Sequence, residues 1–298
     1  MNLKFPFLLL SLLITELFAQ RDLSWMNNYP NAKDWSEYIQ MAPKYLGPNA
    51  LPIPEIYEAK VLPEIEVEGG YSYYKHKTVD APTHSTFLRL YCPVAKNRVG
   101  VEVTFVPYEY YKYSYEAADF LHSHSVKGNG GGDVFINTYL QILRETAKRP
   151  DLTFRYSLRT ASGGNVNDAR YTDSPGYSFD LAVGKDVFAE DNQRVKFFAM
   201  LGFYCWQIED GVNRQDDAFS YGLGASYHNK DWTIKWDLGG YTGYKNNGDS
   251  PVVMRFCADF PIVENLQGRL LYENGLNDYP YKGYHIRLVY SFTPFGEK

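Results

Sequence analysis

Cysteine is scarce in this 298-residue chain, and its three cysteines lie far apart, at Cys92, Cys205 and Cys257. An odd number cannot be fully paired within one chain, and no CxxC or Cys/His spacing is typical of a zinc site. Neither a complete disulfide framework nor a structural zinc ion is therefore indicated. We interpret the cysteines as small hydrophobic side chains within strand-like segments.

A basic excess and long apolar runs are also lacking. Lys and Arg number 30 against 35 Asp and Glu, which gives a formal net charge of −5. Because nucleic-acid binding depends on basic surfaces that displace counterions from phosphates, this balance argues against a nucleic-acid partner. The mean hydropathy of −0.40 leaves no room for a helical membrane protein, whose spans need about twenty apolar residues each.

The first 19 residues are typical of a signal peptide. Lys4 supplies a positive charge, residues 5–14 are mostly apolar, and Ala19 offers a cleavage site. Glu16 ends the apolar run too early for a transmembrane helix. We therefore expect export, with residues 1–19 removed.

Aromatic residues are abundant, at 17% of the chain, and from residue 64 onward apolar and polar residues alternate. A period of two is typical of β-strands. The pattern predicts strands over residues 64–76, 84–94, 98–113, 133–145, 151–161, 175–186, 194–207, 217–228, 231–244, 251–260, 266–275 and 280–292. Short and long connections alternate between them, with 114–132 as the longest loop. This succession favours an up-and-down antiparallel barrel with one elaborated end.

Segment length and aromatic placement favour a transmembrane barrel over a soluble β-sandwich, which shows the same alternation. The segments run to about ten residues, longer than most globular strands and suited to a tilted bilayer crossing. Aromatics such as Tyr108, Trp206, Trp232 and Tyr279 gather near segment ends, as interfacial girdles do. The predicted fold is therefore all-β, a transmembrane antiparallel barrel of about twelve strands over residues 64–298.

The last predicted strand carries a specific resemblance. Gly283 followed by alternating hydrophobic residues and a closing aromatic is similar to the C-terminal insertion signal of Gram-negative bacterial outer-membrane β-barrels; the residues that match are Gly283, Tyr284, Ile286, Leu288, Tyr290 and Phe292. The resemblance implies recognition by the barrel-assembly machinery and contact with outer-membrane lipid in the cell envelope. Thr293 to Lys298 follow the aromatic, so the signal is not at the extreme terminus.

Residues 20–63 differ from the barrel segments, since five prolines between Pro43 and Pro63 favour an extended, non-sheet conformation. We interpret this stretch as an N-terminal extension. It either lies in the periplasm beneath the barrel or folds into the lumen as a plug.

Charges on the polar faces of the strands identify the candidate lumen. Fifteen are assigned inward: Arg89, Arg155, Arg159, Lys196, Lys235, Arg255, Arg269 and Arg287 with Glu66, Glu68, Glu102, Asp180, Asp237, Asp259 and Glu273. All except Glu66, Glu68 and Lys196 form the candidate lumen-lining set. Rings of like charge set pore selectivity, whereas this near-balance fits either a weakly selective channel or an occluded, salt-bridged interior.

The longest loop contains the only motif suggestive of catalysis, His122-Ser123-His124-Ser125. Outer-membrane phospholipases place a Ser two residues from the catalytic His, but here His124 follows His122 at that spacing. We assign no catalytic residue, no metal site and no cofactor. The sequence favours a narrow porin-like channel for small polar solutes. The alternatives are an outer-membrane enzyme acting on lipid or peptide, and an occluded structural or surface-interaction barrel.

Overall fold

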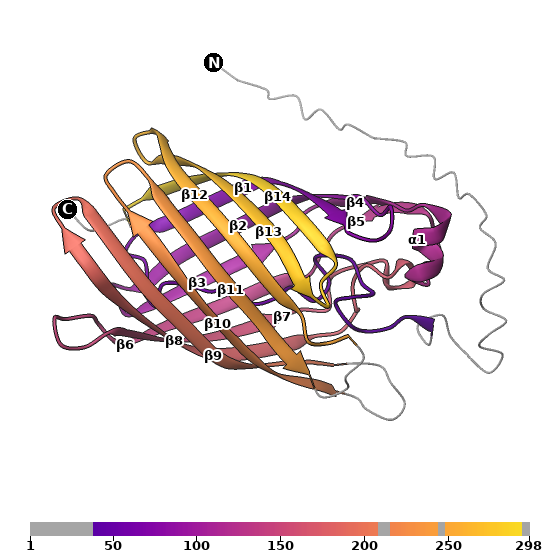
Figure 1. Ribbon diagram of the computed structural model, residues 1–298, viewed down its shortest axis with the longest axis horizontal. Coiled ribbons are helices and arrows are strands. Elements are labelled where there is room, and N and C mark those ends of the chain that lie inside the picture. Colours follow the sequence, from indigo (N-terminus) through magenta and orange to yellow (C-terminus); the bar gives the residue numbers. More distant parts are fainter. Residues whose placement is uncertain (1–37, 208–214, 244–247, 294–298) are drawn as a thin grey trace, which may run out of the picture.

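The computed structural model describes residues 38–207, 215–243 and 248–293; the expected signal peptide and residues 20–37 lie outside the described residues. One antiparallel sheet, in the order β1-β14-β13-β12-β11-β10-β9-β8-β7-β6-β3-β2-β4-β5, is closed into a ring by pairing of β1 with β2 (Figure 1). Its strands are β1 Ile65–His76, β2 Thr83–Ala95, β3 Val99–Phe105, β4 Glu109–Lys112, β5 Lys127–Gly130, β6 Val134–Leu143, β7 Asp151–Arg159, β8 Gly176–Glu190, β9 Gln193–Gln207, β10 Gln215–His228, β11 Thr233–Gly243, β12 Val252–Val263, β13 Leu266–Asn277 and β14 Tyr281–Phe292.

The predicted twelve-stranded barrel is confirmed, with one correction between residues 98 and 132. The segment predicted as one strand is split into β3 and β4 around Pro107, which has no N–H for the sheet. Both pair with β2, so they share one position in the barrel. The stretch predicted as a loop contains helix α1, Tyr115–Phe120, and the short strand β5, which pairs with β4. The sheet therefore has 14 strands, of which 12 form the closed barrel and two, β4 and β5, are additional.

The two ends of the barrel differ as the sequence predicts. Several short turns use residues with left-handed backbone, namely Asn97, Asp191 and Asn265, because Asn and Asp tolerate that conformation best among non-glycine residues. We call this the inner end; β1 begins there and β14 ends there, since Ile65 pairs with Phe292. The opposite, outer end carries the longer connections and α1 (Figure 1).

Side chains segregate to the two faces of the barrel wall. On β14, Tyr284, Ile286 and Leu288 are 48%, 63% and 52% exposed and point outward, whereas His285 between them is buried. Such an apolar outer surface is suited to lipid contact. None of the helices in the described part of the chain is long and apolar enough to span a membrane.

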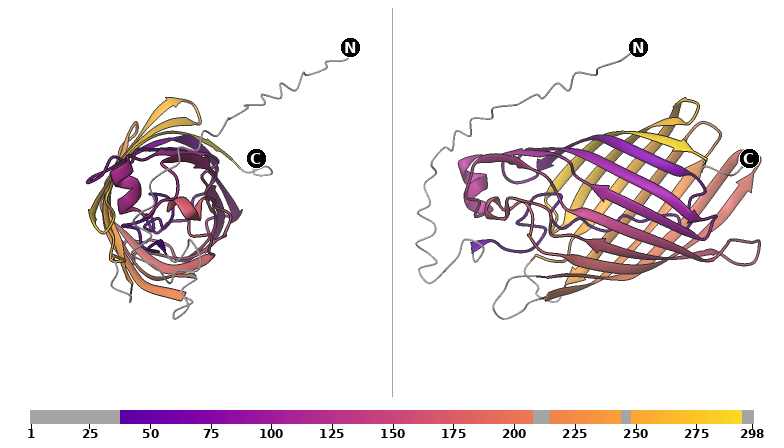
Figure 2. Two further views of the ribbon diagram at one scale, coloured as in Figure 1. Left: turned by 90° about the vertical axis from the view of Figure 1, so that its right-hand side faces the viewer. Right: turned by 180° about the vertical axis from the view of Figure 1, so that it is seen from behind.

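Residues 38–63, which we call the leader, lie within the ring of strands rather than beneath it (Figure 2). Near the outer end, Leu46 and Leu51 are buried against Tyr281, Trp206 and other inward-facing aromatics. Farther along, Ile56 and Ala59 pack on Phe198 of β9. The leader thus runs down the lumen to the inner end, where β1 begins.

Candidate functional site: the lumen and its leader

Barrel side chains hold the leader mainly through its backbone carbonyl groups. Arg159 donates to the carbonyl oxygen of Ala50 at 2.7 Å, and Arg255 donates to that of Ile53 at 2.8 Å. Lys235 donates to the carbonyl of Ile56. Three of the predicted inward charges therefore bind the extended backbone. Because the proline-rich leader cannot pair with a strand, its backbone carbonyl groups accept hydrogen bonds from these side chains instead.

Two further side chains hold the leader near the inner end. The carbonyl of Ala59 accepts hydrogen bonds from Thr153 Oγ1 at 2.6 Å and Gln141 Nε2 at 3.0 Å. Gln141 Oε1 also accepts from the backbone N–H of Val61 at 2.8 Å. The same amide therefore fixes two positions of the leader, which sets its register along the lumen.

Glycines on one side of the barrel make room for the leader. A Cβ atom on Gly222 would lie 2.2 Å from Cδ1 of Ile56, and one on Gly239 would lie 2.9 Å from the same atom. A Cβ on Gly184 would lie 2.6 Å from the carbonyl oxygen of Glu58. Any larger residue would clash, so this wall and the leader are closely fitted.

Opposite charges pair within the lumen, and Glu68 of β1 is the most connected. Its carboxylate is fully buried and lies 3.2 Å from Arg89, 2.9 Å from Arg269 and 3.0 Å from Arg287. Arg89 also contacts Glu102 at 2.5 Å. Buried ions of this kind are tolerated only when paired and hydrogen-bonded.

Similar pairs occur elsewhere around the ring. Arg155 contacts Asp180 at 2.7 Å, and Arg255 bridges Glu273 at 2.9 Å and Asp237 at 3.3 Å. Each pair joins neighbouring strands, so the lumen carries cross-strand ion pairs on several sides rather than a row of one sign.

A cavity of about 220 Å³ lies between the outer half of the leader and the barrel wall. Its polar lining is rich in arginine and tyrosine, with carboxylates between them: Arg89, Arg155, Arg159, Arg255, Arg287, Tyr74, Tyr139, Tyr171, Tyr177, Tyr204, Glu55, Glu102, Asp133 and Glu273. We call it the outer cavity. It has room for several waters or a small polar molecule.

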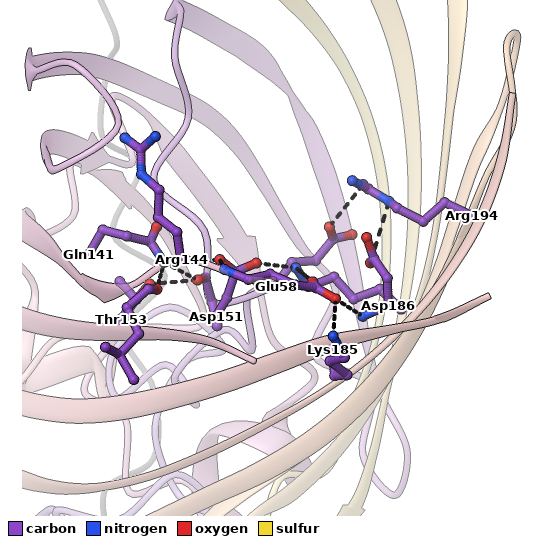
Figure 3. Close-up of polar contacts among 12 residues, drawn as sticks. Glu58, Gln141, Arg144, Asp151, Thr153, Lys185, Asp186 and Arg194 are labelled. Carbon is purple, nitrogen blue, oxygen red and sulfur yellow. Dashed lines mark hydrogen bonds and ion pairs between the residues drawn. The ribbon is translucent and has the colours of Figure 1, made fainter. Parts of the chain in front are cut away.

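A second pocket, of about 410 Å³, opens at the inner end and is also polar. Lys196 reaches Asp151 there at 2.5 Å. Figure 3 shows Arg194 between Glu58 of the leader and Asp186, which lie 3.6 Å and 3.7 Å from it. Glu58 also contacts His228 at 2.8 Å. Glu58 therefore links the leader to charged and polar side chains beside this inner pocket.

An aromatic layer separates the two spaces. Tyr57 of the leader meets Tyr139 edge to face at 5.4 Å, and Tyr139 lies 6.1 Å from Tyr91. Tyr57 also donates to Asp180 at 3.0 Å and lies 4.7 Å below the guanidinium of Arg155. Leader and wall therefore pack against each other between the two spaces.

A buried polar cluster fastens the leader at the outer end. Arg170, in the β7–β8 connection, donates from Nε at 2.8 Å and Nη2 at 2.6 Å to Oε1 of Glu109, and to Tyr113 at 2.9 Å. Glu109 Oε2 accepts from Asn49 of the leader at 2.6 Å and from Tyr171 at 3.1 Å. Burial, together with the charge of Glu109, raises the pKa of Tyr171 well above its ordinary value, so its hydroxyl stays a donor.

The candidate lumen-lining residues are all found on the inner face of the wall. Besides the contacts above, Arg269 reaches Asp259 at 2.7 Å, Lys235 reaches Asp237 at 3.6 Å and Arg159 lies 4.0 Å from Asp133. Their part in solute passage stays a prediction. The residues of the insertion signal lie on β14, with Tyr290, like Tyr284, facing outward at 47% exposure.

In the described histidine-containing loop, Ser123 and His122 each contact a backbone carbonyl group. Ser123 Oγ donates to the carbonyl oxygen of Ser125 at 2.7 Å, and His122 Nδ1 contacts the carbonyl oxygen of Tyr38 at 2.5 Å. Nucleophilic catalysis would need the hydroxyl to contact the imidazole. Among the described residues, no cluster of three or more His, Cys, Asp or Glu side chains could hold a metal ion.

Sequence reasoning missed the leader side of the site. Asn49, Tyr57 and Glu58 contact charged side chains of the barrel, and Glu55 lines the outer cavity. No strand pattern marks these four residues. The run of prolines was the available signal, because it identifies an extended chain whose carbonyls need external donors. The alternation of polar and apolar residues predicts that Glu68 points inward. Its contacts with three arginines could not be predicted, because they depend on how neighbouring strands are aligned.

No protein-family model matches the sequence, and no curated protein matches it either. Solved structures do resemble the fold. An outer-membrane channel from Pseudomonas putida F1 aligns with a TM-score of 0.51 at 14% identity, over 80% of this chain and 100% of that one. The NanC porin aligns with a TM-score of 0.52 at 12% identity, over 76% of this chain and 100% of that one. The chain therefore has the fold of the Gram-negative outer-membrane β-barrels.

Proposed function

We propose that the protein is a porin-like outer-membrane channel for small polar solutes, whose leader closes the lumen in the structure described here. The observation that carries the proposal is the pair of polar spaces at the two ends of the lumen, separated by one aromatic layer to which the leader contributes Tyr57. Displacement of the leader would join the two spaces into one path.

The fold and the wall support this proposal. The outward-facing apolar side chains suit a bilayer, and two solved structures with the same fold are described as an outer-membrane channel and a porin. The leader adds no covalent barrier, since its contacts are hydrogen bonds, ion pairs and packing. Such contacts can be broken and remade while the barrel wall persists.

A near-balance of charge in the outer cavity indicates weak selectivity. Five arginines face four carboxylates in its lining, and cross-strand pairing neutralises most of them. A solute that offers both hydrogen-bond donors and acceptors would replace the water there at little cost. The chemistry therefore fits polar or zwitterionic solutes better than a strongly charged one.

The test is single-channel conductance in a planar bilayer. Refolded protein that begins at Gln20 is compared with protein that begins at Glu64 and lacks the leader. We expect low or intermittent conductance from the first and steady conductance from the second, with ion selectivity that changes when Arg255→Glu is introduced into the shorter chain. Lys148→Gln, an exposed inner-end change, is the matched control.

A second candidate function has one observation in its favour. The close fit of the leader against Gly222, Gly239 and Gly184 also suits a permanently occluded structural barrel. Silence of both chains in the bilayer, with both correctly folded, would contradict the channel and favour this alternative.

A further inference from the structure

Four lysines form one row around the outside of the barrel near its outer end. Lys282 of β14 lies directly opposite Lys75 of β1, and Lys112 of β4 lies directly opposite Lys127 of β5. β2 lies between the two pairs, and the backbone N–H of Lys112 donates to the carbonyl of Pro82, the residue that precedes β2. With adjacent strands about 4.8 Å apart, the row extends over roughly 19 Å.

All four side chains point away from the lumen. Each is exposed, and its neighbours in the strand, such as Tyr74, His76 and Tyr281, are buried and face inward. Within the described part of the chain none of the four forms an ion pair. Lys77, in the connection after β1, adds a fifth positive charge, and partial burial together with the charge of Lys282 lowers its pKa.

Like charges opposite one another in an antiparallel pair destabilise the sheet. The row contains two such pairs, so the protein alone gains nothing from it. A ligand with several negative charges would turn this repulsion into attraction. On strands β6 to β11, the described outer ends carry no comparable outward-facing lysine or arginine row, so the feature is confined to one arc of the wall.

An aromatic row lies directly beneath the lysines. This row lies two residues closer to the inner end than the lysines. It consists of residues that pair directly across β14, β1, β2 and β4, namely Tyr284, Tyr73, His84 and Tyr110. Their rings are in sequence, with centroid distances of 6.4 Å, 5.1 Å and 6.2 Å. Tyrosines of this kind mark the level of lipid headgroups in transmembrane barrels, which places the lysines at or just above that level.

We infer that this lysine row is a binding site for the phosphate groups of a phosphorylated glycolipid in the outer leaflet, whose acyl chains lie along the apolar wall below. The inference rests on the proposed outer-membrane placement. Ammonium groups bind phosphate strongly. The aromatic row sets the level of the headgroup, and below it the exposed side chains of Ile286 and Tyr71 continue the apolar surface. A row this wide can contact more than one phosphate of the same headgroup.

The experiment measures equilibrium binding of bisphosphorylated lipid A to the protein in neutral detergent micelles. The variant is Lys75→Gln with Lys282→Gln. Each lysine near an anionic headgroup contributes on the order of a fivefold change in affinity, so we expect about 25-fold weaker binding. Lys75→Arg with Lys282→Arg should bind as the wild type does. Lys148→Gln with Lys230→Gln, two exposed lysines at the inner end, is the matched control and should also be unchanged.

Three results would overturn the inference: equal binding by the Gln pair, equal binding of lipid A from which the phosphates have been removed, or displacement of lipid A by inorganic phosphate at equal concentration. The last would assign the row to free phosphate. Folding of each variant is checked by heat-dependent mobility in SDS gels. The bilayer recordings contain no lipid A, so the two proposals fail separately. A wild-type protein that conducts but does not bind lipid A would reject only this site, and one that binds lipid A but does not conduct would reject only the channel.

Discussion

Replacement of Glu68 by Gln is expected to destabilise the barrel strongly. The carboxylate is fully buried and lies within 3.2 Å of three guanidinium groups. Arg89 and Arg269 keep other carboxylates in the variant, Glu102 and Asp259 respectively. Arg287 does not, because Glu68 is its single ion-pair partner within the described residues. Removing one partner of a buried pair costs about 3–5 kcal/mol.

Glutamine also brings its own N–H groups against the same arginines. Its amide has one acceptor oxygen, whereas the carboxylate has two. At least one guanidinium would face a donor and lose its hydrogen bond. We therefore expect the lower end of that range as a minimum, about 3 kcal/mol in the free energy of unfolding.

The assay is urea-induced unfolding in phospholipid vesicles, followed by tryptophan fluorescence. Glu66→Gln is the control, since Glu66 is 18% exposed and Arg89 is its single ion-pair partner among residues that the structure describes. Its loss should cost about 1 kcal/mol or less. The double variant Glu68→Gln with Arg287→Met should recover part of the loss, because it removes the unpaired cation. Equal effects of Glu68→Gln and Glu66→Gln, or no recovery in the double variant, would refute the reasoning.

Three further outcomes test the fit of the leader. Gly222→Val should clash with Ile56 and destabilise the closed state by about 1–3 kcal/mol. In bilayer recordings the open population should then rise roughly 5- to 150-fold. The outward-facing control Leu223→Val should leave conductance unchanged. Tyr57→Ala should raise conductance by opening the aromatic layer, whereas Tyr57→Phe keeps the ring and should raise it little. Arg170→Lys replaces a guanidinium that makes two contacts with Glu109 and should weaken the outer cluster by about 2 kcal/mol. The measurement is backbone amide hydrogen exchange around Asn49, which should become faster. Unchanged exchange would contradict the role assigned to Arg170.

The barrel was predictable from sequence because its wall repeats one rule. Outward residues such as Ile286 and Leu288 are apolar and exposed, and inward residues such as Arg287 face the lumen, so a period of two fixes both faces at once. Boundaries followed from turn residues such as Asn97 and Asn265. The exception lay at Pro107, where a single missing N–H splits a strand whose alternation continues on either side.

The candidate site was only half predictable, for a physical reason. Strand phase shows that Arg159 and Arg255 point inward, but not that they donate to carbonyls of Ala50 and Ile53. Backbone acceptors leave no trace in side-chain identity, because every residue has one. The lysine row was missed for a related reason: its four members lie far apart in sequence and meet only through register.

The path of the leader has a consequence for the sidedness of the molecule. An even number of strands alone would leave both chain ends at one end of the barrel. The leader adds one more crossing, because Tyr38 lies beside His122 at the outer end while Ile65 starts at the inner end. The described chain therefore crosses thirteen times, and its first residue and its last emerge on opposite sides. The twelve-residue seam between β1 and β14 therefore closes a wall around a segment of the same chain, and the chain is enclosed by the barrel that it goes on to build.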